Sequence, residues 1–149
     1  MTDTQTLHIE RTFQAPVEKV FDAWTSEEVL RRWWRVEAGW ETSGAEVDLR
    51  VGGAVRVVMR DPAKGSDVGG GGTYTEVDPP HRLAFTWTWD GDTRQTLIEI
   101  DFEEADGATN VRFTHSLLWD EEAARRHEYG WNKLFDNFER MLTAARTEG

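Results

Sequence analysis

Histidine has the widest chemical range of the side chains in this sequence, because a neutral imidazole serves as acid, base or metal ligand near pH 7. The 149-residue chain contains His8, His81, His115 and His127. No two of them are spaced i,i+2 or i,i+4, whereas a zinc site needs three or four ligands. The spacing therefore predicts no metal site. The absence of cysteine excludes thiolate catalysis and cysteine-bound metals.

His115 is the polar residue on the apolar face of an alternating segment, residues 111–117. Two interpretations stay open. It is a core histidine, hydrogen-bonded to the backbone or to a nearby hydroxyl, or it contacts a ligand or acts as an acid or base. In the second case Glu76, two residues from Tyr74 and expected on the same strand face, would be the partner of a catalytic dyad.

Four consecutive glycines at residues 69–72 raise the question of a phosphate-binding loop. The run lacks the Lys-Ser or Lys-Thr ending of such a loop, and it precedes a predicted strand rather than a helix. We therefore expect a flexible hairpin loop there. Nothing else in the sequence indicates a cofactor.

Charge and length limit the partners, the location and the number of domains that we expect. The 17 basic and 28 acidic residues give a net charge of −11, which argues against nucleic-acid partners and anionic membranes. No apolar run approaches the ~20 residues that span a bilayer. Residues 1–8 are polar, so we expect no signal peptide and a cytoplasmic protein without membrane insertion. The length predicts a single domain covering residues 1–149.

The first part of the chain predicts one strand and two short helices. Apolar and polar residues alternate over residues 7–13, which is typical of a half-buried strand. Pro16 favours a helix start, because its missing N–H costs nothing at the first helical position. Thr25 and Glu28 fit a capping box for a second helix that carries residues 29–34.

The period of the apolar pattern then changes twice. From Glu46 to Leu118 it is two, with turn signals that separate antiparallel strands. Beyond Asp120, the apolar residues from Trp131 to Ala145 form one helical stripe. One-sided strands need a cover on their apolar face, and the final helix is the expected cover.

Six sequence runs together carry a resemblance to a known family. They are APVEKVFDAW (15–24), WW (33–34), GG (52–53), DPPHRLAFTW (78–87), VRFTHS (111–116) and HEYGW (127–131). From about Leu7 to Leu142 the chain resembles the bacterial proteins similar to the activator of heat-shock-protein-90 ATPase, in the START-like (SRPBCC) superfamily. The resemblance implies an α+β helix-grip fold, with a curved six- or seven-stranded antiparallel sheet wrapped around a long C-terminal helix. It also implies two short helices after strand one, and a cavity that takes apolar molecules in the superfamily.

We expect a cavity between sheet and final helix, lined by apolar and aromatic side chains with few polar groups. The candidate lining residues are Trp33, Val57, Met59, Tyr74, Phe85, Trp87, Phe113, His115, Trp131, Phe135 and Phe138. No residue is assigned a catalytic role. The sequence favours non-catalytic binding of a small hydrophobic or amphipathic ligand over an enzyme.

Three alternatives remain open. The family name suggests a chaperone partner, and a small hydrolase or cyclase of the same superfamily would use His115 with Glu76 or Tyr74. A homodimer is favoured if Trp34 or Trp40 is exposed.

The roles of Trp33 and Trp34 also stay open. Adjacent helical positions point about 100° apart, so the two side chains cannot face the same way. Either one of them lines the cavity mouth or a partner surface, or both are packing residues.

Overall fold

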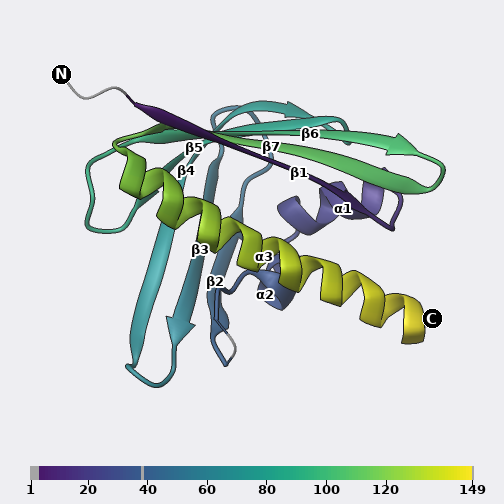
Figure 1. Cartoon of the computed structure of the whole chain (residues 1–149), viewed down its shortest axis with the longest axis horizontal. Helices are drawn as coiled ribbons and strands as arrows, with labels where there is room; N and C mark the ends of the chain where they lie inside the picture. The colour runs from purple at the N-terminus through teal and green to yellow at the C-terminus, as the bar shows by residue number, and fades with distance from the viewer. Residues whose placement is uncertain (1–3, 38, 149) are drawn as a thin grey trace.

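The computed structural model describes residues 4–37 and 39–148, and side chains up to residue 144 (Figure 1). The elements are β1 (Gln5–Phe13), α1 (Val17–Thr25), α2 (Glu27–Trp33), β2 (Glu41–Val47), β3 (Ala54–Asp61), β4 (Ser66–Asp78), β5 (Arg82–Trp89), β6 (Thr96–Ala105), β7 (Ala108–Leu118) and α3 (Glu121–Glu148). Their order is the one expected from the sequence.

All seven strands belong to one antiparallel sheet, in the order β1-β7-β6-β5-β4-β3-β2. Each strand from β2 to β7 pairs with its neighbour in sequence, and β1 closes the other end by pairing with β7. The sheet is strongly curved and does not close into a barrel: β1, β6 and β7 run across the direction of β2 to β4, and α3 crosses between them (Figure 1). The expected α+β helix-grip fold is confirmed, with seven strands.

The two short helices begin where local sequence favours them, with one correction. Pro16 precedes α1 in an extended conformation. The cap of α2 is Ser26, whose hydroxyl accepts a hydrogen bond from the Val29 N–H at 3.3 Å. Thr25, the expected cap, is still part of α1 and donates its hydroxyl to the Phe21 carbonyl. The cap falls one residue later because α1 continues through Thr25.

An aromatic cluster fills the centre between sheet and helices. Trp24 of α1 lies at its middle, with ring centroids 4.9–6.2 Å from those of Trp33, Trp34, Phe113, Trp131 and Phe135. Both Trp33 and Trp34 are packing residues, since they are 0% and 2% exposed. Trp34 is therefore no exposed anchor for a dimer, and Trp40 is half-buried.

The four glycines are part of strand β4 rather than a flexible loop, which corrects the sequence prediction. They pair with β3, and Gly70 and Gly71 also pair with β5. A Cβ atom on Gly70 would lie 2.6 Å from Cζ2 of Trp87, and one on Gly72 would lie 2.0 Å from the Thr86 carbonyl oxygen. Glycine is needed here because neighbouring groups occupy the space of a side chain.

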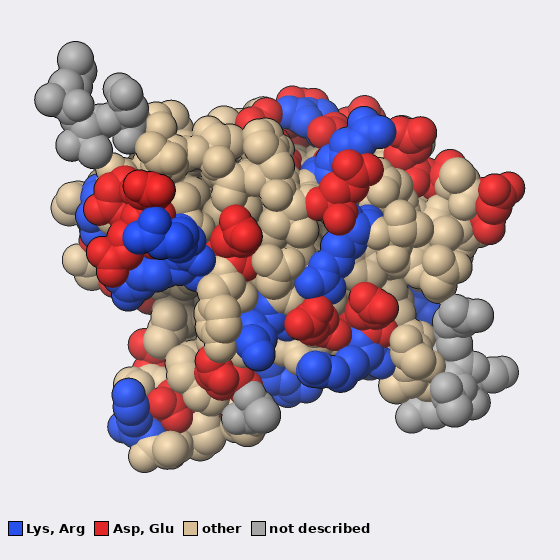
Figure 2. Space-filling model, in the orientation of Figure 1, with Lys and Arg blue, Asp and Glu red and all other residues tan. Residues whose placement is uncertain are grey.

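Charged side chains of both signs lie on the surface of the molecule. Lysine and arginine are interspersed with aspartate and glutamate over the face in Figure 2. Arg82 contacts Glu76, Glu99 and Asp101 at 2.6–2.9 Å on the outer face of the sheet. Within the described residues, no helix is long and apolar enough to cross a bilayer.

Candidate functional site

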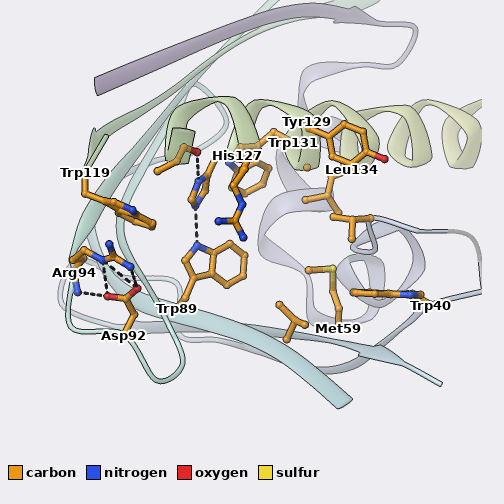
Figure 3. A pocket seen from close by; sticks show the side chains of 15 residues that line it. Trp40, Met59, Trp89, Asp92, Arg94, Trp119, His127, Tyr129, Trp131 and Leu134 are labelled. Carbon is orange, nitrogen blue, oxygen red and sulfur yellow. Dashed lines mark hydrogen bonds and ion pairs between the residues drawn. The ribbon is translucent and has the colours of Figure 1, made fainter. Parts of the chain in front are cut away.

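A pocket of about 480 Å³ lies beside the first half of α3 (Figure 3). One wall comes from α3, the opposite wall from the ends of β3, β4 and β5, and the remainder from the segments that follow α2, β5 and β7. The pocket is therefore displaced from the centre of the sheet, where the aromatic cluster lies. Its volume falls in the ~300–1,000 Å³ range of small-molecule sites.

The walls of the pocket are mainly apolar. Five aromatic side chains line it, namely Trp40, Trp89, Trp119, Tyr129 and Trp131. Aliphatic side chains complete the walls, namely Val36, Met59, Val68, Ala123 and Leu134. Such a surface favours a ligand that buries apolar area.

His127 forms the polar centre of the pocket wall and is held in one tautomer (Figure 3). Its Nε2 accepts a hydrogen bond from the Trp89 indole N–H at 2.8 Å. Its Nδ1 lies 2.7 Å from the Ala123 carbonyl oxygen, so Nδ1 carries the proton and donates it there. Burial lowers the pKa of His127, the Ala123 carbonyl opposes this, and the nearby charge of Arg126 adds to the lowering. The imidazole is neutral.

His115 lies behind this wall in a second, fully buried chain of hydrogen bonds. Its Nδ1 accepts from the Trp131 indole N–H at 3.1 Å, and its Nε2–H donates to the Thr96 hydroxyl at 2.8 Å. The Thr96 hydroxyl in turn donates to the Trp87 carbonyl at 2.8 Å. Burial, with the neighbouring His127, lowers the pKa of His115 to about 3. His115 is thus the core histidine with a hydroxyl partner, the first of its two interpretations.

The dyad of His115 and Glu76, which the second interpretation required, does not form. The pairing of β4 with β5 shifts register between Tyr74 and Glu76, and this bulge places the two side chains on opposite faces. Tyr74 is 1% exposed, whereas Glu76 lies outside, 2.8 Å from the Arg82 guanidinium. A carboxylate on the outer face cannot assist a histidine in the core.

An ion pair forms one end of the pocket. The Arg94 guanidinium donates to Asp92 at 2.6–3.2 Å and lies over the Trp119 ring, 3.7 Å from its centroid. Arg94 holds the pKa of Asp92 well below its usual range. Both charges are therefore present near pH 7, and they neutralise each other within the pocket (Figure 3).

Two of the eleven expected lining residues, Met59 and Trp131, line this pocket. The other nine are buried in the core, and their contact with a ligand stays a prediction. They are Trp33, Val57, Tyr74, Phe85, Trp87, Phe113, His115, Phe135 and Phe138.

Several pocket residues were missed in the sequence because they lie in connecting segments or on the flank of α3. Asp92 was part of a turn signal, and Arg94, Trp119 and Val36 carried none. His127 had a usable signal, since it precedes Trp131 by four residues and so shares its face of the helix. Within residues 4–37 and 39–148, no three His, Asp or Glu side chains form a metal-binding group.

Comparisons with known proteins agree with this architecture. No curated protein matches the chain. The AHSA1 protein from Silicibacter pomeroyi is 28% identical, with 95% of this chain and 99% of that chain covered and a TM-score of 0.82. The AHSA1-like protein from Aeromonas hydrophila is also 28% identical, with 95% and 94% covered and a TM-score of 0.81.

A protein from Chromobacterium violaceum, 23% identical, shares the fold with a TM-score of 0.84 over 92% of this chain and 96% of that chain. The model of one family, described as activator of Hsp90 ATPase homolog 1-like protein, matches residues 14–143. That match spans nearly every strand and helix described above. The chain therefore belongs to the activator of Hsp90 ATPase homolog 1-like family.

Proposed function

We propose that this protein binds a small hydrophobic or amphipathic molecule in the pocket beside α3 and does not transform it. The observation that carries the proposal is the pocket itself, with a volume of about 480 Å³ and five aromatic side chains among its lining residues. Burying a ligand against such walls is worth roughly 25 cal/mol per Å² of apolar surface. The proposal places the ligand at the rim of the core rather than at its centre.

The hydrogen bonding of the two histidines supports binding without catalysis. A general base needs a nitrogen lone pair within reach of the substrate. The lone pair of His127 is occupied by the Trp89 indole, and that of His115 by the Trp131 indole. Releasing either one would leave an indole N–H without its partner, buried in Trp131 and half-buried in Trp89.

Gly130 allows a sharp test, because it lines the pocket from α3. A Cβ atom there would lie 3.8 Å from Cγ1 of Val36, an ordinary contact, so Gly130→Ala fits without strain. The larger side chain of Gly130→Leu must extend beyond that Cβ into the space between α3 and Val36. Both changes favour the helix, by up to about 1 kcal/mol for alanine.

The assay is fluorescence titration with N-phenyl-1-naphthylamine, a neutral apolar probe that brightens when it leaves water. We expect saturable binding to the wild type and to Gly130→Ala, and binding at least about tenfold weaker to Gly130→Leu, which corresponds to 1.4 kcal/mol. Thermal unfolding checks that both variants are folded. Equal binding by all three proteins, or none by the wild type, would remove the proposal.

The family description supports a second candidate, a chaperone cofactor. The proposal is that the chain changes the ATPase rate of the heat-shock-protein-90 chaperone of its own cell. The test is the steady-state ATPase rate of that chaperone with and without the chain at increasing ratios. A saturable rate change supports this candidate, and an unchanged rate together with no binding in a pull-down removes it.

A further inference from the structure

The charges at the pocket do not sum to zero. Besides Asp92 and Arg94, which pair with each other, the ionisable residues that line it are Arg126, Tyr129 and His127. His127 is neutral, because its Nε2 accepts a hydrogen bond. The charge of Arg126 therefore has no partner among the residues that line the pocket, in a protein whose net charge is −11.

Arg126 is exposed and, within the described residues, forms no ion pair or hydrogen bond. Its neighbour Arg125 differs, since it pairs with Glu121 one helical turn earlier at 3.5 Å. Glu122 is related to Arg126 by the same spacing and lies with it along a neighbouring surface depression, yet the two form no ion pair. A further carboxylate, that of Glu37, accepts a hydrogen bond from the Tyr129 hydroxyl at 3.4 Å.

The position of Arg126 suits an anion that enters with an apolar body. Its guanidinium offers several N–H donors in a fixed plane, which match the two oxygens of a carboxylate. The aromatic walls beside it exclude water from one side, and a charge pair is stronger there than in bulk water. A neutral ligand would leave this exposed guanidinium with water as its only partner.

We propose that the ligand of this pocket is a carboxylic acid with an aromatic or aliphatic body, whose carboxylate pairs with Arg126. The inference rests on the proposed function and adds the chemical class of the ligand. The apolar body then lies against Trp89, Trp119 and Trp131, and the acid group stays at the exposed edge of the pocket. An acid group at that edge keeps partial hydration, so its transfer into the site costs little.

Matched pairs of acid and alcohol test the inference. In the fluorescence assay, 2-naphthylacetic acid and 2-(2-naphthyl)ethanol displace N-phenyl-1-naphthylamine, and dodecanoic acid and 1-dodecanol provide a second pair. The proteins are the wild type, Arg126→Gln, and Arg125→Gln as the matched control for the loss of one positive charge from the same turn. Both positions are exposed, and urea unfolding confirms that the variants remain folded.

The wild type should bind each acid about tenfold more tightly than its alcohol, a value typical of a hydrogen-bonded charge pair. Arg126→Gln should remove that preference and leave the affinities for the alcohols within about twofold of their wild-type values. Arg125→Gln should retain the preference for the acids. Acid and alcohol of equal affinity in the wild type, or a preference that survives Arg126→Gln, would overturn the inference while probe binding still supports the pocket. Failure of the probe itself to bind overturns the proposed function, and this inference falls with it.

Discussion

The folded protein holds His115 in its neutral form, so a fall in pH should destabilise the protein through this residue. The ordinary histidine pKa near 6.5 falls to about 3 in the folded chain, because burial disfavours the imidazolium. Below pH 6.5 the unfolded state binds a proton that the native state does not bind until about pH 3. The stability that His115 contributes is therefore fully present above pH 6.5 and is lost as the pH falls toward 3.

The size of the effect follows from the two pKa values. Each unit of difference corresponds to 1.36 kcal/mol of differential interaction. Between pH 7 and pH 4.5, about 2.5 kcal/mol of unfolding free energy should be lost through His115. The lowered pKa of His127, whose ring centroid lies 5.0 Å away, acts in the same direction.

The test compares the wild type with His115→Gln by urea unfolding followed through tryptophan fluorescence. At pH 7 the variant should be less stable by about 1–3 kcal/mol, because the Trp131 indole loses its acceptor. From pH 7 to pH 4.5 it should lose about 2.5 kcal/mol less than the wild type. Replacement of an exposed histidine, His81→Gln, is the control and should follow the wild-type curve.

Parallel curves for wild type and His115→Gln over this pH range would contradict the lowered pKa of His115. They would mean that the folded chain binds the proton as readily as the unfolded chain. The hydrogen bonds to Trp131 and Thr96 could not then hold a neutral imidazole.

Three further predictions concern stability, each measured as the free energy of unfolding in urea at pH 7. Ser26→Ala should cost about 1 kcal/mol, because the Val29 N–H loses its cap, and a cost under about 0.3 kcal/mol would argue against that cap. Gly70→Ala should cost about 1–3 kcal/mol through the Trp87 ring, and unchanged stability would contradict the close approach. Phe113→Ala should cost about 3–5 kcal/mol, whereas a loss near 1 kcal/mol would indicate a loosely packed centre.

The fold was largely predictable because its strands alternate regularly. Val57 and Met59 share the inner face of β3, and Phe113 and His115 share that of β7, as the period of two requires. Two local features could not be predicted from the sequence pattern, for physical reasons. On the neighbouring strand, the Trp87 ring requires Gly70 and the Thr86 carbonyl requires Gly72, and the bulge after Tyr74 reverses a face without any change of composition.

The site was less predictable than the fold. An apolar inner face indicates a covered sheet, but it does not tell which part of the covered space is filled. Trp24 of α1 occupies the centre by packing against rings from α2, β7 and α3. The remaining space lies at the start of α3, where connecting segments supply about a third of the lining residues and follow no periodic pattern.

The most direct test of a ligand site beside α3 is a two-dimensional ¹H–¹⁵N spectrum of the indole N–H groups during titration with N-phenyl-1-naphthylamine. Trp89 lines the pocket and donates to His127, whereas Trp33 is buried in the core and donates to the Ala23 carbonyl. We predict that the Trp89 resonance shifts saturably while that of Trp33 stays in place. A shift of Trp33 without one of Trp89, or no shift of either, would contradict a ligand site beside α3.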